Sequence, residues 1–250
     1  MNSVGPKLLA SQQPCPYIEG KTETLFHVVF PEYSTDELSV RDSLIDAFWS
    51  DFGSHGYRRQ GRLVYRPYCS NCEACIATRV LVNEFQMKRR FRRILRANKD
   101  IEIEVSREKL VSDHEAFRLY DKYIKTRHTN GSMYPPDFNT LRTMLHLEPD
   151  RLDFHIYGFL GDRLVFIAQT DRLLDGLSAN YTIFDTDLSE RSLGTFAILT
   201  QIELARRDGL DHLYLGFALD AVKNMRYKMD FQPQERLIED EWVRFDDHHE

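Results

Sequence analysis

The 250-residue sequence predicts a mixed α/β (α+β) protein. Three apolar, β-rich runs between residues 153 and 184 are separated by the turn pairs Gly161-Asp162 and Asp175-Gly176, which predicts an antiparallel meander. A helical pattern from Ser192 to a stop at Gly209, followed by an apolar run, then predicts a helix and a further strand. With 42% hydrophobic residues, the chain can form one large domain or two small ones.

The N-terminal part predicts fewer regular elements. We expect residues 1–20 to be irregular, a turn at 32–34, and a helix over 39–52, where apolar residues recur at helical spacing. A loop with a glycine at each end spans 53–61, and the β-branched run at 76–82 indicates a strand.

Helices and strands follow in quick succession. We expect a helix at 87–97, a strand at 101–105, and helices at 113–127 and 137–146, the second preceded by Pro135 and Pro136. After the meander, Ser192 can cap the long helix. A strand at 212–217, a short helix at 223–229 and a strand at 237–245 complete the prediction.

This order of elements is typical of an N-acetyltransferase-like (GNAT) fold, a mixed sheet with flanking helices. We expect that domain to span residues 81–250 and a small cysteine-containing module to span residues 1–80. Fold alone does not indicate function. In acetyltransferases of this fold, small residues at the start of the long helix let coenzyme A phosphate approach the backbone. Here Arg191 and Gly194 fit that motif but Phe196 does not, which argues against coenzyme A.

Two compositional features suggest a cytoplasmic protein with reduced thiols. No apolar run is long enough to span a membrane, and the N-terminus lacks the pattern of a signal peptide. Four cysteines in a chain of this length do not form a disulfide scaffold.

The net charge of −6 conceals one strongly basic segment, residues 86–99, which holds seven basic residues and no acid. Such a segment can bind RNA phosphates, although it can also be a solvated helix face. The candidate RNA-binding residues are Lys88, Arg89, Arg90, Arg92, Arg93, Arg96 and Lys99.

The cysteines also form a pattern. Cys69, Cys72 and Cys75 recur every three residues, and Cys15 is the fourth thiol. Four thiolates can hold a zinc ion or an iron–sulfur cluster. The alternative is a set of reduced thiols without a metal.

Several long motifs carry a resemblance: CPYI at 15–18, YRRQGRLVYRPYCSNCEAC at 57–75, LYDKYIKTRH at 119–128, RSLGTFAILTQIELARRDGLDHLYLGF from 191 and MRYKMDFQP at 225–233. Together they resemble the bacterial aminoacyl-tRNA–protein transferases, the leucyltransferase branch of the arginyltransferase family. The resemblance implies transfer of leucine from leucyl-tRNA to proteins that begin with Asp or Glu, as in the N-end rule (N-degron) pathway. One departure is Ala218-Leu219, where the family often has Trp-Ile.

The reaction makes modest demands, because the aminoacyl ester is already activated. Amine and ester must be held together, a proton accepted and an oxyanion stabilised. No nucleophile motif or cofactor is required. Polar residues of the meander are the catalytic candidates: Asp171, Tyr181, Asp185 and Gln169.

An acidic acceptor side chain calls for arginine, which pairs with a carboxylate through two hydrogen bonds. Candidates are Arg58, Arg59, Arg62 and Arg66, which alternate with tyrosines, and the pair Arg127-His128. The arginines at 58–66 can also read RNA or simply pack against the tyrosines.

The aminoacyl group is predicted from the apolar run at 213–219, with Phe196 and Ile198 opposite it. A wall of this kind favours leucine over arginine, whose charge would need acidic partners. The expected partners are leucyl-tRNA and proteins with N-terminal Asp or Glu, without membrane or coenzyme A. Arginyl transfer, coenzyme A-dependent acetyl transfer and RNA binding without catalysis are the alternatives.

Overall fold

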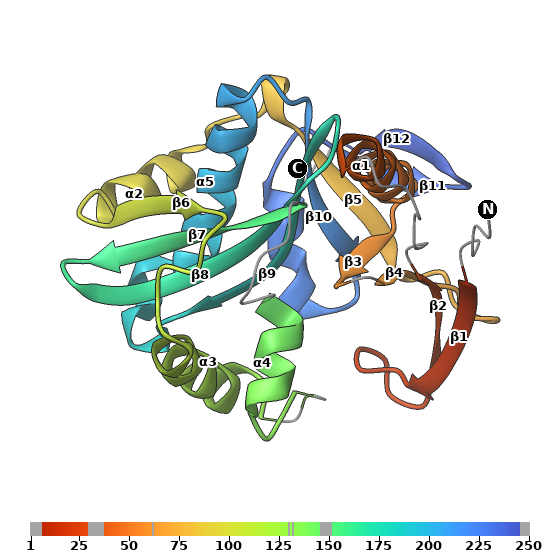
Figure 1. Ribbon diagram of the computed structural model, residues 1–250, viewed down its shortest axis with the longest axis horizontal. Coiled ribbons are helices and arrows are strands. Elements are labelled where there is room, and N and C mark those ends of the chain that lie inside the picture. The colour runs from red at the N-terminus through yellow and green to blue at the C-terminus, as the bar shows by residue number, and fades with distance from the viewer. Residues whose placement is uncertain are drawn as a thin grey trace.

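The computed structural model describes residues 7–29, 38–61, 63–129, 131, 133–145 and 152–245. These residues form a mixed α/β protein with two sheets, as Figure 1 shows. The larger sheet has eight strands in the order β12-β11-β5-β10-β9-β8-β7-β6, and the smaller has four in the order β1-β2-β4-β3. Bounds of the strands are β1 (Lys7–Pro14), β2 (Thr22–Val29), β3 (Arg58–Gln60), β4 (Leu63–Pro67), β5 (Ile76–Leu81), β6 (Glu102–Ser106), β7 (Asp153–Leu160), β8 (Arg163–Arg172), β9 (Gly176–Phe184), β10 (His212–Ala218), β11 (Gln234–Ile238) and β12 (Glu241–Phe245).

Helices connect and cover these strands. The α-helices are α1 (Leu38–Ser54), α2 (Arg89–Ala97), α3 (Asp113–Arg127), α4 (Phe138–Leu145) and α5 (Leu193–Arg207). Short 3-10 helices are η1 (Val82–Glu84), η2 (Thr186–Arg191) and η3 (Lys223–Asp230).

The meander β7–β8–β9 is confirmed, and together with β6 it forms one half of the larger sheet. Gly161, with φ +58°, supplies the left-handed conformation of its first turn. Most of β8 is buried, because helices cover the sheet on both faces. The predicted helix over 113–127 is also confirmed, with Ser112 capping it by accepting from the Glu115 amide.

One strand pair in the larger sheet is parallel. After the crossover through α5, β10 pairs with β9 only from His212 to Tyr214, and every other named pair in this sheet is antiparallel. Beyond Tyr214, β10 continues its pairing with β5 alone. β9 and β10 therefore separate toward the side where the small sheet lies.

The two faces of the larger sheet are covered by different helices (Figure 1). Helices α2 and α5 share the main core with apolar residues from one face. Helices α3 and α4 form a second core with residues of the other face, including Ile167 and Ile183. Any site beside α4 consequently lies across the sheet from α2.

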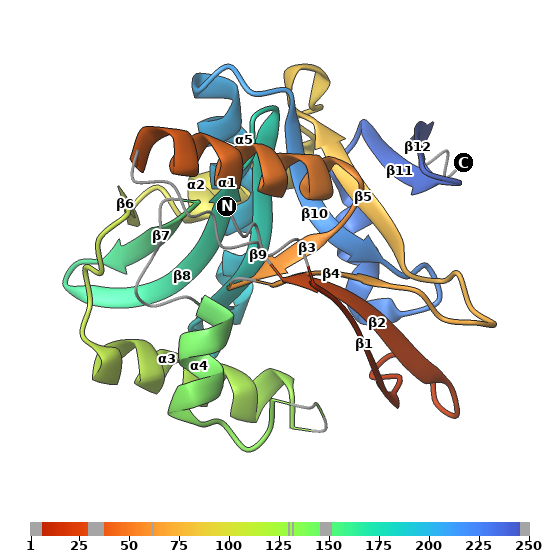
Figure 2. The same ribbon diagram turned by 45° about the vertical axis from the view of Figure 1, so that its right-hand side comes forward.

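A third core surrounds α1, where Trp49 is fully buried against residues from both sheets. Figure 2 shows α1 above β3 and β4, with the β1–β2 hairpin projecting away from the rest of the molecule. The expectation that residues 1–20 are irregular is wrong, because Lys7–Pro14 form β1. Every residue of β1 is exposed, so the strand carries no burial pattern to reveal it.

Other local predictions need correction. The loop at 53–61 contains β3, and the single strand at 237–245 is the hairpin β11–β12, which turns at Glu239 and Asp240 with positive φ. Ser192 occupies the N-cap position of α5 in a left-handed conformation, but its side chain makes no capping hydrogen bond. The turn expected at 32–34 lies outside the described residues.

The division of the chain near residue 80 stays a prediction. Strand β5, just before that point, lies between β10 and β11 in the larger sheet. Within the described ranges, no helix combines the length and the apolar character required to cross a membrane.

Candidate active site

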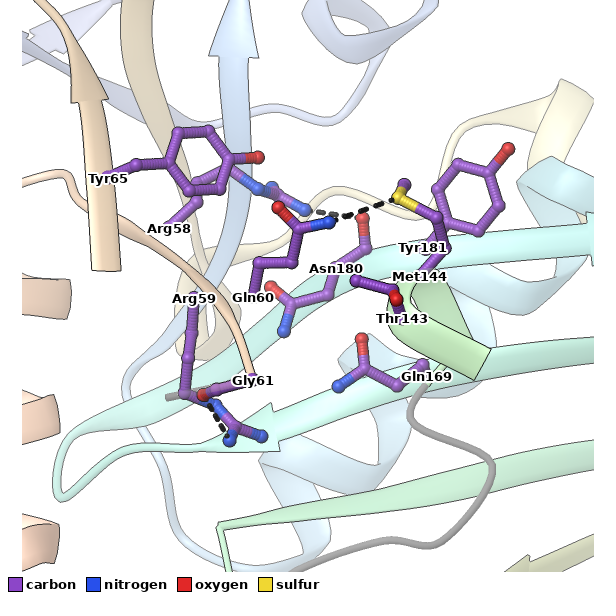
Figure 3. Close-up of a pocket in the computed structure, with 10 residues that line it drawn as sticks. All are labelled: Arg58, Arg59, Gln60, Gly61, Tyr65, Thr143, Met144, Gln169, Asn180 and Tyr181. Atoms are coloured by element: carbon purple, nitrogen blue, oxygen red, sulfur yellow. Dashed lines mark hydrogen bonds between the residues drawn. The ribbon is translucent and has the colours of Figure 1, made fainter. Parts of the chain in front are cut away.

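A pocket opens where the smaller sheet meets the meander and α4. The turn between β3 and β4 forms one side, α4 another, and β8 and β9 the floor, as Figure 3 shows. None of the described residues that line it is acidic. The lining residues are Arg58, Arg59, Gln60, Gly61, Tyr65, Thr143, Met144, Gln169, Asn180 and Tyr181.

Arg59 and Asp171, two of the predicted site residues, meet in a buried ion pair at this pocket. Nε of Arg59 donates to Oδ2 of Asp171 at 2.9 Å, and Nη2 donates to Oδ1 at 2.7 Å. The same Nη2 lies 3.4 Å from Asp153, and Gln169 donates to both carboxylates. All four side chains are buried, so the charge of Arg59 is fully compensated by two carboxylates below the pocket.

Arg58 is arranged differently. Its Nη2 donates to the backbone carbonyls of Ala179 and Asn180, and it has no acidic partner among the described residues. The guanidinium lies against Gly216, which has φ +73°. A Cβ atom added to residue 216 would lie 1.9 Å from Nη1 of Arg58. Only glycine leaves room for Arg58 at this point. The positive charge therefore reaches the pocket without a carboxylate to neutralise it.

Tyr181 and Gln169 line the same pocket, and both side chains already donate hydrogen bonds to neighbouring residues. The Tyr181 hydroxyl donates to the sulfur of Met133 at 3.2 Å, and burial raises the pKa of this phenol. Tyr181 is thus a neutral hydrogen-bonding group at physiological pH. Gln169 is 4% exposed and holds its amide toward the two buried carboxylates.

The other candidates lie outside the pocket lining. Asp185 caps η2, accepts a hydrogen bond from Lys122 at 2.7 Å and pairs with Arg163. Arg66 donates to Asp240 at 2.8 Å, near the β11–β12 turn. Arg62 lies outside the described residues.

The pair Arg127-His128 ends α3. Arg127 is exposed, and His128 lies 3.3 Å from the Tyr123 hydroxyl. Burial, and to a lesser extent the Arg127 charge, lowers the pKa of His128. The imidazole is therefore neutral at physiological pH, which weakens its attraction for an anion.

Helix α2 presents its basic residues to solvent while Phe91 and Ile94 anchor it in the core. Arg90 pairs with Asp230, and the rings of Phe91 and Phe231 stack at 5.0 Å. These contacts join the start of α2 to the end of η3. The seven candidate RNA-binding residues, all exposed, are Lys88, Arg89, Arg90, Arg92, Arg93, Arg96 and Lys99.

The four cysteines, Cys15, Cys69, Cys72 and Cys75, are free thiols. Burial raises the pKa of Cys75 to about 12, and the charges of Cys15, Cys69 and Cys72 contribute. The thiols therefore lie close enough to interact electrostatically. Among the described residues, however, no three His, Cys, Asp or Glu side chains are placed so as to hold a metal ion.

The apolar run at 213–219 does not form the expected pocket wall. Leu213, Leu215, Phe196 and Ile198 all belong to the main core, and Ala218 and Leu219 are buried as well. None of these residues appears in the pocket lining. Just before α5, Arg191 is bound to Asp100 by hydrogen bonds of 2.7 and 3.0 Å.

Two residues at the site were missed by sequence reasoning. Asn180 lines the pocket because of a strand irregularity that has no sequence signature. Lys228 lies in the motif MRYKMDFQP, whose residue types do not by themselves indicate a role for this lysine. Its Nζ donates to the Phe217 carbonyl at 2.6 Å, and burial together with the Arg58 charge lowers its pKa to about 7.

Among solved structures, the fold overlaps loosely with a crystal structure of a conserved protein of unknown function from Bacteroides thetaiotaomicron. The TM-score is 0.46 at 12% identity, over 88% of this chain and 80% of that one.

Sequence comparison is far more specific. The chain is 39% identical over 242 residues to an aspartate/glutamate leucyltransferase from Teredinibacter turnerae, covering 96% of this chain and 94% of that protein. It is 41% identical to the protein of the same name from Pseudoalteromonas atlantica, covering 92% and 93%. Residues 13–93 match the family described as arginine-tRNA-protein transferase, N terminus, and residues 115–238 match its C terminus. The chain therefore belongs to the arginine-tRNA-protein transferase family.

Proposed function

We propose that this protein is an aspartate/glutamate leucyltransferase, which moves leucine from leucyl-tRNA to the α-amine of proteins with N-terminal Asp or Glu. The observation that carries the proposal is identity of 39% and 41% over more than nine-tenths of the chain to proteins of that name. A pocket that contains arginine and no described acidic residue agrees with an acidic acceptor.

The reaction forms one bond and breaks another. The acceptor's α-amine nitrogen attacks the leucyl ester carbonyl, an amide bond forms, and the bond to the tRNA ribose oxygen breaks. The amine loses one proton and the ribose oxygen gains one. Because an α-amine has a pKa near 8, part of it is already neutral at pH 7. Holding the two reactants together can supply much of the rate.

Within this scheme the predicted residues take different roles. Gln169 and Tyr181 line the pocket, and we assign them to the reacting groups. Asp171 serves to hold Arg59 in place beneath them. Asp185 belongs to a separate ion cluster with Lys122 and Arg163.

Arg58 is the better candidate of the two pocket arginines for the acceptor carboxylate. Arg59 already binds Asp171 at two points, whereas Arg58 donates only to backbone carbonyls among the described residues. A carboxylate brought by the substrate would therefore neutralise Arg58. Arg66 is bound to Asp240 and lies outside the pocket lining.

The tRNA would approach from α2. This helix lies across the sheet from α4, but its first turn is tied to η3 through Arg90 and Asp230. Helix η3 in turn bonds β10 through Lys228 and Phe217, close to Arg58. The aminoacyl end of a tRNA that follows this route would pass from the exposed arginines to the point where β9 and β10 separate.

That separation also supports assignment of the larger sheet to the N-acetyltransferase-like type. The parallel pairing of β9 and β10 covers three residues on each strand and follows a crossover through one long helix. Coenzyme A is not the expected ligand, because Phe196 stands where the coenzyme A motif has a small residue.

The four cysteines are proposed as ligands of a zinc ion or an iron–sulfur cluster. This requires the thiols to move closer together, because among the described residues no three of them are placed to hold a metal ion. Their thiols approach from two separate loops and already interact electrostatically. A bound cation would stabilise the thiolates, because burial and, to a lesser extent, the neighbouring thiolate charges raise the pKa of Cys75. The expected contribution is to the folding of this part of the chain, because metal binding and folding are coupled.

The function is tested by supplying leucyl-tRNA and arginyl-tRNA, each radiolabelled, with peptides beginning Asp, Glu, Lys or Ala. Label should pass mainly from leucyl-tRNA to the Asp and Glu peptides. Mainly arginyl-peptide would identify the protein as an arginyl transferase instead. No product with either tRNA would contradict an aminoacyl transferase.

A further inference from the structure

Strand β9 contains a bulge at Asn180. Gln169 of β8 pairs with Tyr181, and the next residue, Thr170, pairs with Ala179, so Asn180 has no opposite residue in the ladder. Neighbouring residues of a regular strand point to opposite faces. The bulge lets both Asn180 and Tyr181 line the same pocket.

The amide of Asn180 is held in one orientation. Oγ of Ser178 donates to Oδ1 of Asn180 at 2.9 Å. The other end, Nδ2, is buried and has no hydrogen-bond partner among the described residues. Figure 3 shows this amide between Gln60 and Gln169, within the space that the pocket residues enclose. A buried donor without an acceptor is unfavourable, and an acceptor on a ligand would remove that penalty.

The surrounding chemistry indicates which acceptor fits. Arg58 is the nearby cation without a described acidic partner, and its guanidinium is fixed on the backbone carbonyl of Asn180 itself. A carboxylate entering the pocket could accept from Asn180 while it approaches Arg58. Both donors are aligned on one short segment of β9, so they would engage one anionic group.

We propose that Asn180 determines acceptor specificity: its Nδ2 donates to the side-chain carboxylate of the N-terminal Asp or Glu, beside Arg58. This inference rests on the proposed leucyl transfer and names the residue that selects the acceptor. An aspartate at this position would keep the shape and the Ser178 hydrogen bond but replace the donor with a negative charge. It would repel the acidic acceptor and pair with Arg58.

The test compares wild type with Asn180→Asp, using leucyl-tRNA and peptides that begin with Asp, Glu, Asn or Gln. We expect kcat/KM for the Asp and Glu peptides to fall by about 10- to 100-fold, the value of one hydrogen bond to a charged group. The KM for leucyl-tRNA and transfer to the Asn and Gln peptides should stay near wild type. Asn139→Asp, an exposed change of equal charge on α4, is the matched control and should leave all four peptides unaffected.

An unchanged preference for Asp over Asn peptides in folded Asn180→Asp protein would overturn the inference. A rise in the KM for leucyl-tRNA as large as the loss of kcat/KM for the acidic peptides would also overturn it. Should Asn180→Asp not fold, Asn180→Ala removes the donor without adding charge, and about a tenfold loss is expected for acidic peptides. If wild type transfers no leucine, the proposed function fails by itself. Calorimetric binding of an Asp-starting peptide to wild type and variant would then still test Asn180.

Discussion

Arg59 and Asp171 form a two-point ion pair in which the side chains are 1% and 0% exposed. Strand β3 of the smaller sheet supplies the arginine, and β8 of the larger sheet supplies the carboxylate. The pair therefore fastens the two sheets together directly below the pocket. Its geometry fixes the neighbouring Arg58 and Gln60, which line the pocket from the same strand.

Breaking this pair should destabilise the whole protein. Asp171→Asn keeps the shape but removes the two-point ion pair and leaves Arg59 with Asp153, at 3.4 Å, as its carboxylate partner among the described residues. Removing one partner of a buried ion pair costs about 3–5 kcal/mol. The free energy of unfolding, measured in urea, should fall by that amount. Asp208→Asn, in the more exposed pair with Arg172, is the control and should cost about 1 kcal/mol or less. A stable Asp171→Asn protein with a selective loss of kcat would instead support a catalytic role for this carboxylate.

Lys228 should make stability depend on pH. Its pKa is lowered from 10.5 to about 7 by burial and by Arg58. Between those two values the unfolded chain binds more protons than the folded one, so the contribution of Lys228 to stability rises with pH. Below pH 7 both states are protonated, and the cost of burying the charge is present in full.

The measurement is the difference in unfolding free energy between wild type and Lys228→Met, taken at pH 7, 8 and 9. The unfolding free energy of wild type should rise relative to that of Lys228→Met at each step in pH. The variant also lacks the hydrogen bond to Phe217, but that penalty is the same at every pH. Lys223→Met, at the start of the same 3-10 helix, serves as the control and should follow wild type. A difference that does not change with pH would contradict a neutral, buried Lys228.

The exposed arginines of α2 should govern tRNA affinity. Replacing Arg89, Arg92 and Arg96 with Gln keeps good helix formers in place. Each lost phosphate contact should lower the slope of log K against log salt by about 0.7–1. Filter binding across a salt titration measures this slope.

A control double variant, Arg107→Gln with Arg118→Gln, removes exposed charge away from α2 and should change the slope little. Equal slopes for the α2 variant and wild type would mean that tRNA binds elsewhere.

The cysteine cluster should bind metal. Protein purified without oxygen is expected to contain near-stoichiometric zinc or iron, and Cys72→Ser should lose it together with part of the thermal stability. Elemental analysis and thermal melting supply the two readouts. Ser70→Ala, in the same loop, should keep both the metal and the melting temperature. Active protein without either element would exclude a metal requirement.

The regular centre of the fold could be predicted from local pattern. Apolar runs and glycine turns indicated the meander, and the helix over Asp113–Arg127 agrees to the residue. The strands of the smaller sheet were missed, because β1 is exposed along its whole length and the three residues of β3 are too few for a pattern. In such strands, hydrogen bonding to neighbours decides the structure rather than side-chain periodicity.

Some features of the candidate site could likewise be predicted from the sequence, and others could not. From its long motifs the sequence alone determined the family, the basic face of α2 and the group of arginines at 58–66. It also located Gln169 and Tyr181 in the strands that form the pocket floor. These conclusions depend on residue types at short spacing, and such patterns are visible in the sequence before the fold is known.

Only the tertiary structure decided which charges are free. Arg58 and Arg59 are adjacent in sequence, yet Arg59 is neutralised by Asp171, 112 residues away, while Arg58 lies on backbone carbonyls. Asn180 enters the pocket through a bulge that depends on the register between β8 and β9. The physical reason is that ion pairing, burial and strand register are set by contacts between distant segments, and no local pattern records them.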